Sequence, residues 1–271
     1  MTAVTSTDRT GLAGLIGHPR LARFARVTLA TIVGLEVLWI LLVFVQQWLT
    51  NPAFGLDYRW HVDAAQRLLD TGTPYWPWQI SGPYEISDGA ILYPPTAFLL
   101  FIPFIWLPAV LWWAVPIAIT AVAMAIHRPP LWAWAVVGGL IAFEKSLNVY
   151  IFGNPSMWIV AAIAAGTVLA WPFVLVLIKP TFAPIALLGI RHRSWWIAGG
   201  LLLLASIPFG KVWLDWFAVV TNSNVSLVYN LPTLPLMCAP LVAWLAGSRR
   251  PGLPWPKPAA QGDEVPAQVV G

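Results

Sequence analysis

Long stretches without a charged side chain determine what this chain can fold into. Three of them, residues 89–126, 146–178 and 216–248, contain no Asp, Glu, Lys or Arg. A membrane-spanning helix needs about 20 apolar residues, so each stretch is long enough to cross a bilayer. Backbone polar groups in lipid must be paired within the chain, and a helix pairs them locally. The sequence therefore predicts an all-α, polytopic integral membrane protein.

The composition excludes a soluble domain. Of the 271 residues, 10% are charged, whereas an average soluble domain has about 25%. Too little polar surface remains to cover a soluble core of this size. The basic residues behind the net charge of +4 are scattered between neutral stretches, unlike those of a nucleic-acid-binding face. We therefore expect membrane lipids as partners, and no nucleic acid.

The expected topology follows from the basic residues. Four arginines precede the first apolar stretch, 27–49, so the positive-inside rule places residues 1–26 in the cytoplasm. A hairpin near Pro108 gives about eight spans, whereas one broken helix there gives about six; we favour eight. We expect residues 27–248 to form the transmembrane domain. Residues 249–271 are expected to be a disordered cytoplasmic tail.

Charge is concentrated in the predicted first extracytoplasmic loop, residues 50–92, which holds five of the eleven acidic residues. Residues 55–70 within it have the pattern of an amphipathic helix. Four charged side chains fall on one stripe of its helical wheel, which a solvated or interfacial helix face explains. These are Arg59, Asp63, Arg67 and Asp70.

Asp57 lies on the opposite face of that helix, together with His61, Leu68 and small alanines. Two interpretations of this carboxylate stay open. It can cap the start of the helix, where Asp is favoured. It can instead lie against a cavity at the membrane surface, where partial desolvation adjusts its pKa for proton abstraction.

Lys179 stands alone in a long apolar region, where a charged side chain is costly and is usually functional or paired. The structural alternatives are a side chain that reaches the interface, or pairing with Glu36 of the first span. Most of the 18 tryptophans are explained as interfacial anchors. Those in polar loops, Trp60, Trp76 and Trp78, could instead stack on carbohydrate.

Several short motifs occur in a fixed order along the chain. They are Asp57, Ala64-Ala65, Leu68-Leu69, Gly72, Pro74-Tyr75, Tyr93-Pro94-Pro95, Pro103 to Pro108, Gly153-Asn154-Pro155-Ser156 and Lys179-Pro180 with Pro184. This order resembles family 87 of the glycosyltransferases, which are membrane enzymes of the GT-C fold that use polyprenyl-phosphate-linked sugars. Actinobacterial mannosyl- and arabinofuranosyltransferases typify the family. The resemblance covers roughly residues 27–195. Asn154 stands where the family has Gln, and the chain lacks several carboxy-terminal spans of longer members.

The resemblance implies a GT-C-like helical bundle in a bacterial plasma membrane, with both termini cytoplasmic and neither a cofactor nor a metal. It implies that Asp57 is the general base of an inverting transfer. The transferred sugar is expected to be a hexose such as mannose. Its donor is a polyprenyl-phosphate-linked sugar, and its acceptor is a lipid or a glycan. Candidate partners for the leaving phosphate are Lys179, Arg59 and His61, and candidate sugar or acceptor contacts are Tyr75, Trp76, Tyr93 and Asn154.

A second hypothesis is a non-catalytic membrane protein, either a carrier of lipid-linked sugars or an accessory subunit of a transferase. The short chain motivates it. A transporter would bring ionisable residues together near the middle of the bilayer. Only Glu36 and Lys179 qualify, which favours the enzyme.

Overall fold

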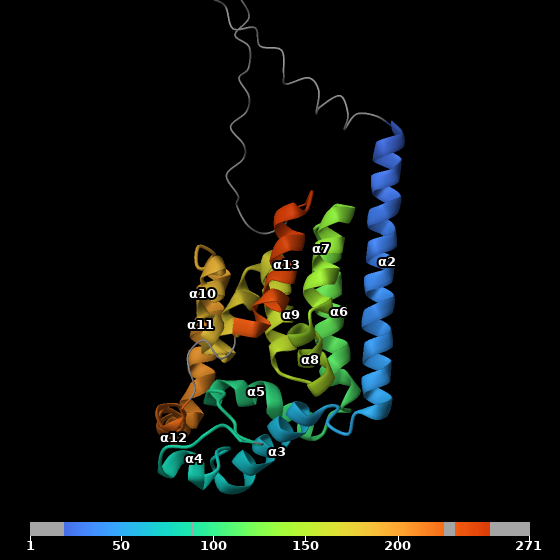
Figure 1. Cartoon of the computed structure of the whole chain (residues 1–271). Helices are drawn as coiled ribbons and strands as arrows, with labels where there is room; N and C mark the ends of the chain where they lie inside the picture. Colours follow the sequence, from blue (N-terminus) through green and yellow to red (C-terminus); the bar gives the residue numbers. More distant parts are fainter. Residues whose placement is uncertain (1–18, 88, 225–230, 250–271) are drawn as a thin grey trace, which may run out of the picture.

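The computed structural model describes residues 19–87, 89–224 and 231–249 (Figure 1). Helices make up the regular structure of these residues, apart from one isolated bridge between Tyr84 and Ser223. The predicted all-α class is therefore confirmed. Most of the predicted amino-terminal segment and nearly all of the predicted tail lie outside the described residues.

Ten helices of the described part have eight residues or more. They are α2 (Pro19–Thr50), α3 (Leu56–Thr71), α6 (Val110–Ile126), α7 (Leu131–Ala142), α8 (Glu144–Phe152), α9 (Ser156–Leu169), η3 (Trp171–Ile178), α11 (Arg193–Ser206), α12 (Gly210–Asn222) and α13 (Leu234–Ala246). Shorter ones lie between them: α4 (Pro77–Ser81), η1 (Pro95–Ala97), α5 (Phe98–Phe101), η2 (Ile102–Ile105), η4 (Pro180–Phe182), α10 (Ala183–Ala186), η5 (Leu187–Gly189) and η6 (Ile207–Phe209).

Fewer helices can cross a membrane than the sequence predicted. In the described part, α2 and the helical stretch 193–222 are long and apolar enough to do so. Two bent helix pairs raise the number to four if each pair is one span. The prediction of about eight spans is therefore wrong. It failed because the remaining apolar sequence is divided into helices of 10–17 residues, which are shorter than a bilayer requires.

Prolines account for part of this division. The chain bends by 120° between residues 95–105 and α6, and this break contains the expected turn at Pro108. Pro180 begins η4, as expected of a residue that tolerates the first turn of a helix. Pro116, in contrast, lies inside α6 without ending it. Proline position therefore predicts some helix ends in this chain and not others.

Two regions of the molecule differ in arrangement. Helices α6, α7, α9 and α13 pack together as a bundle, and α2 runs along it against α7 and α8 without burying a residue of its own. Helices α3, α4, α5 and α12 gather at one end of the bundle (Figure 1). This end layer contains the polar residues discussed below.

The predicted amphipathic helix is α3. Its buried residues are His61, Ala64, Ala65 and Leu68, the face that the helical wheel grouped with Asp57. Gly55 occupies the N-cap with a φ of 70°, and no side chain caps the helix. The N-cap interpretation of Asp57 is therefore wrong, because Asp57 lies within the first turn.

Candidate functional site

A cavity of about 450 Å³ lies between the end layer and the bundle. Its walls come from α3, from residues 86–87 and 90–94, from the turn between α8 and α9, from the residues that follow η3, and from α12. Polar side chains on these walls include Asp57, His61, Tyr93, Asn154 and Lys179. We call this space the Asp57 cavity. It brings together residues that the sequence separates by more than 100 positions.

The carboxylate of Asp57 is held by an amide. Its Oδ2 accepts a hydrogen bond of 2.7 Å from Nδ2 of Asn154. Burial raises the pKa of Asp57, while this hydrogen bond and the positive charge of Lys179 act against the rise. The raised pKa makes Asp57 a stronger base than an exposed aspartate, and the amide fixes where its oxygens lie.

The turn that carries Asn154 is pressed against α3. Gly153 has a φ of 70°, and a Cβ at this position would lie 2.7 Å from the side chain of Trp113 and 2.9 Å from that of Tyr58. Nε1 of Trp112 donates to the Gly153 carbonyl at 2.7 Å. A glycine is therefore required here, both for its backbone conformation and for the close approach. The close approach brings Asn154 within reach of Asp57.

Asn154 is oriented by its own turn. Its Oδ1 accepts a hydrogen bond of 2.9 Å from the backbone N–H of Ser156. The hydroxyl of Tyr93 also approaches this oxygen, at 3.5 Å. Because the amide oxygen faces these donors, the NH₂ group is directed at the carboxylate of Asp57.

Lys179 is buried, with 8% of its surface exposed. Its Nζ donates a hydrogen bond of 2.7 Å to Oγ of Ser156, and it lies 5.7 Å from the centre of the Tyr93 ring. Among the described residues, an ion pair within 4 Å joins Lys145 to Glu144 and none involves Lys179. Lys179 therefore carries a charge in the cavity without a carboxylate in contact.

The structural alternatives for Lys179 are wrong. The side chain is buried in the cavity wall and does not reach out to solvent. Glu36, its proposed partner in the first span, contacts Gly138 of α7 instead. Glu36 therefore belongs to the packing of α2 on α7, and Lys179 belongs to the Asp57 cavity.

His61 contributes a neutral ring. Its Nδ1 lies 2.5 Å from the carbonyl oxygen of Asp57, and its ring meets Tyr93 and Phe101 edge-on. Burial lowers the pKa of His61 to about 4, and Lys179 acts in the same direction. At neutral pH the ring therefore carries no charge for a phosphate. Its Nε2 is buried and has no hydrogen-bond partner in the described part of the chain.

Three predicted site residues lie outside the Asp57 cavity. Arg59 is exposed and donates to the carbonyl of Phe54 at 2.9 Å, so it holds the connection between α2 and α3. Tyr75 is fully buried, and its hydroxyl donates to the carbonyl of Tyr93 at 2.8 Å. Trp76 lines a second, more open pocket. The structure therefore brings together Asp57, His61, Tyr93, Asn154 and Lys179, and separates the other three from them.

Several residues at the cavity were not predicted as site residues, and Ser156 and Trp216 make the clearest contacts among them. Ser156 positions Lys179 and stands within the turn motif, so a small polar residue in an apolar stretch was the available signal. Trp216 lines the cavity from α12, and its Nε1 donates to the Leu92 carbonyl at 3.0 Å. No local pattern marks Trp216, because its partner lies 124 positions away.

Within the described residues, no three His, Cys, Asp or Glu side chains come together as a metal-binding group. Comparisons of the chain with protein-family models, curated proteins and solved structures find no match. The residues of the Asp57 cavity and the order of motifs in the sequence are therefore the indications of function.

Proposed function

We propose that this protein is a membrane glycosyltransferase that moves a hexose from a polyprenyl-phosphate donor to a hydroxyl of a lipid or glycan acceptor. One observation carries the proposal: a desolvated carboxylate, Asp57, and a buried cation, Lys179, line the same cavity. The order of motifs that resembles family 87 glycosyltransferases supports the same function.

In the proposed reaction Asp57 is the general base. Its carboxylate takes the proton of the acceptor hydroxyl as that oxygen bonds to the anomeric carbon of the sugar. The bond between this carbon and the phosphate oxygen breaks at the same time, and the phosphate leaves with the electron pair. Attack from the side opposite the phosphate inverts the anomeric centre. The raised pKa of Asp57 favours proton transfer, and the hydrogen bond from Asn154 keeps the carboxylate in position.

Lys179 is proposed to stabilise the leaving phosphate. An ammonium group has three N–H donors, and one of them is directed at Ser156. The others can donate charge-assisted hydrogen bonds to phosphate oxygens, which are strong in a buried site. The neutral Nε2 of His61 is available to accept a hydrogen bond from a hydroxyl of the sugar.

Transfer from a radiolabelled polyprenyl-phosphate mannose by the purified protein tests the proposal. Asp57→Asn should abolish transfer to a membrane glycolipid acceptor, while the variant remains folded and monodisperse in detergent. Asp70→Asn, on the same helix, is the matched control and should retain transfer, because Asp70 is exposed and lines neither pocket. Undiminished transfer by Asp57→Asn would contradict the proposal.

A specific observation favours a second candidate function. Two to four helices of the described part can cross a membrane, fewer than expected for the bundle that the resemblance implies. A non-catalytic protein that binds a lipid-linked sugar, either as a carrier or as an accessory subunit, is compatible with this reduced bundle. If the purified wild-type protein binds polyprenyl-phosphate mannose and never converts it, this second function replaces the first.

A further inference from the structure

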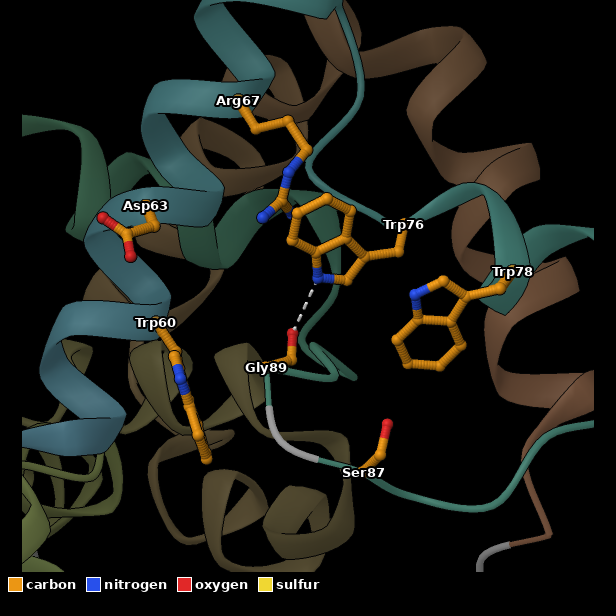
Figure 2. A pocket seen from close by; sticks show the side chains of 7 residues that line it. All are labelled: Trp60, Asp63, Arg67, Trp76, Trp78, Ser87 and Gly89. Atoms are coloured by element: carbon orange, nitrogen blue, oxygen red, sulfur yellow. Dashed lines mark hydrogen bonds between the residues drawn. The ribbon is translucent and has the colours of Figure 1, made fainter. Parts of the chain in front are cut away.

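A second pocket of about 500 Å³ lies beside the Asp57 cavity. Three tryptophans line it together with one acid and one base, and all are drawn in Figure 2. We call it the tryptophan pocket. Its lining side chains are Trp60, Asp63 and Arg67 from α3, and Trp76 and Trp78 from the start of α4.

The aromatic rings of this pocket are fixed and still accessible. The guanidinium carbon of Arg67 lies 3.5 Å from the centre of the Trp76 ring, and Nε1 of Trp76 donates to the Gly89 carbonyl at 3.2 Å (Figure 2). Trp78 packs edge-on against Tyr84, with ring centres 5.2 Å apart. Nevertheless, 37% of Trp76 and 38% of Trp78 remain exposed. Rings held in this way offer apolar surface to a ligand at little cost in side-chain entropy.

The charges of the pocket favour a neutral polar ligand. Arg67 donates a hydrogen bond to the Pro74 carbonyl and stacks on Trp76, so its guanidinium is already engaged. Asp63 acts on Arg67 through its opposite charge, and the pair leaves no net charge for an anion. The exposed carboxylate of Asp63 has no hydrogen bond to any described residue. It is therefore free to accept hydrogen bonds from ligand hydroxyls.

A sugar ring combines the features that these groups recognise. Its C–H face is apolar and fits an aromatic side chain, while its hydroxyls donate to a carboxylate. A neutral hexopyranose has no phosphate or carboxylate for Arg67 to pair with, and the engaged guanidinium requires none. The chemistry of the tryptophan pocket therefore matches a neutral sugar better than it matches a lipid phosphate.

The tryptophan pocket adjoins the Asp57 cavity. Trp60 and Ser87 line both spaces. Asp57 and Asp63 lie on the same helix, about 9 Å apart along its axis. A chain of sugar rings that enters the tryptophan pocket can therefore extend along α3 toward Asp57.

We infer that the tryptophan pocket binds a neutral hexopyranose ring of a glycan acceptor, next to the ring whose hydroxyl reaches Asp57. The inference rests on the proposed function and specifies its acceptor. It makes Trp78 and Asp63 residues that determine acceptor affinity, whereas Asp57 performs the chemistry.

Saturation-transfer difference NMR on the full chain in detergent tests this inference, with mannotriose and maltotriose as neutral probes. At least one trisaccharide should bind through its ring C–H protons. Trp78→Ala should weaken that binding about tenfold, and Trp78→Phe should restore most of it. Trp106→Ala is the matched control, because Trp106 is 72% exposed and lines neither pocket.

The outcomes separate this inference from the proposed function. If neither trisaccharide binds the wild-type protein, or if Trp78→Ala binds as tightly as the wild type, the inference is overturned whether or not Asp57→Asn abolishes transfer. Tighter binding of glucose 1-phosphate than of either trisaccharide also overturns it. If a trisaccharide binds in a Trp78-dependent way and no transfer occurs, the sugar site stands and the transferase proposal fails.

Discussion

Two aspartates lie six residues apart on α3, each near a basic residue, and their surroundings make them different. Asp57 and Lys179 are placed in a cavity by partners from distant parts of the chain, such as Asn154 and Ser156. Asp63 and Arg67 stand on the accessible side of the same helix and contact nearby residues. Burial changes the proton affinities of Asp57 and Lys179, whereas the exposed carboxylate of Asp63 stays available for recognition. The same residue types can therefore serve chemistry or binding, depending on what covers them.

The largest expected effect concerns the two cations. Lys179→Gln should lower kcat/KM for transfer by about 10²–10³, because it removes the charge that meets the leaving phosphate in a buried site. Arg67→Gln should raise the KM for the acceptor and leave kcat near the wild-type value. Steady-state kinetics with separately varied donor and acceptor measures both. Equal losses of kcat in the two variants would contradict the assignment of Lys179 to catalysis and of Arg67 to acceptor binding.

The next effect concerns the two glycines that allow α3 to be placed. Gly153→Ala should destabilise the protein by about 1–3 kcal/mol, because the added Cβ meets Trp113 and Tyr58 and the residue has a φ of 70°. Gly72→Ala is the matched control, since Gly72 has a φ of 79° and no atom within 4 Å of an added Cβ. It should lose only about 1 kcal/mol, the cost of the backbone conformation. Thermal unfolding in detergent measures the difference, and equal destabilisation would show that packing against α3 contributes nothing.

A smaller effect concerns the acid limb of the pH profile. In the proposed reaction the carboxylate form of Asp57 is the active one, and burial raises its pKa, so kcat/KM should fall at a pH above the usual range of an aspartate. Asn154→Ala removes a hydrogen bond that lowers this pKa, so the acid limb should move to still higher pH. Asp63→Asn should leave the limb in place. If the acid limb stays at the same pH in Asn154→Ala, a group other than Asp57 controls the fall of kcat/KM.

The smallest effect is expected for Arg59. Arg59→Gln should transfer sugar within about twofold of the wild-type rate, because the guanidinium is exposed and lines neither pocket. The measurement is the initial rate at saturating donor. A loss of tenfold or more would indicate that Arg59 binds the donor phosphate. Exposed charges near α3 would then contribute to transfer as buried ones do.

The buried face of α3 could be predicted from the sequence, because helical periodicity is local. The wheel that set Asp57, His61 and Leu68 apart from Arg59 and Asp63 agrees with the burial in the structure. A lone lysine in an apolar region likewise pointed to Lys179. Both inferences needed only neighbouring residues and the cost of burying a charge.

The number of spans and the composition of the cavity wall could not be predicted in the same way. An apolar stretch can be buried in lipid or in the protein interior. Helices such as α9 and α13 were therefore counted as membrane spans, although they are too short to be candidates. Tyr75 and Trp76 are sequence neighbours in a polar loop, yet one is fully buried and the other lines the tryptophan pocket. Their separation depends on contacts with residues 89–93, which no local pattern reveals.

The walls of the Asp57 cavity have a consequence for biosynthesis. Asp57 is made early, but its amide partner, its neighbouring cation and the wall from α12 emerge from the ribosome one after another. The bridge between Tyr84 and Ser223 joins the segment before residue 87 to the end of α12, so it can form only after α12 has been made. The nascent chain therefore cannot complete the walls of the Asp57 cavity until α12 has been made. The surroundings of the Asp57 carboxylate are thus completed late in translation, and a chain that stops before α12 lacks one wall of the cavity.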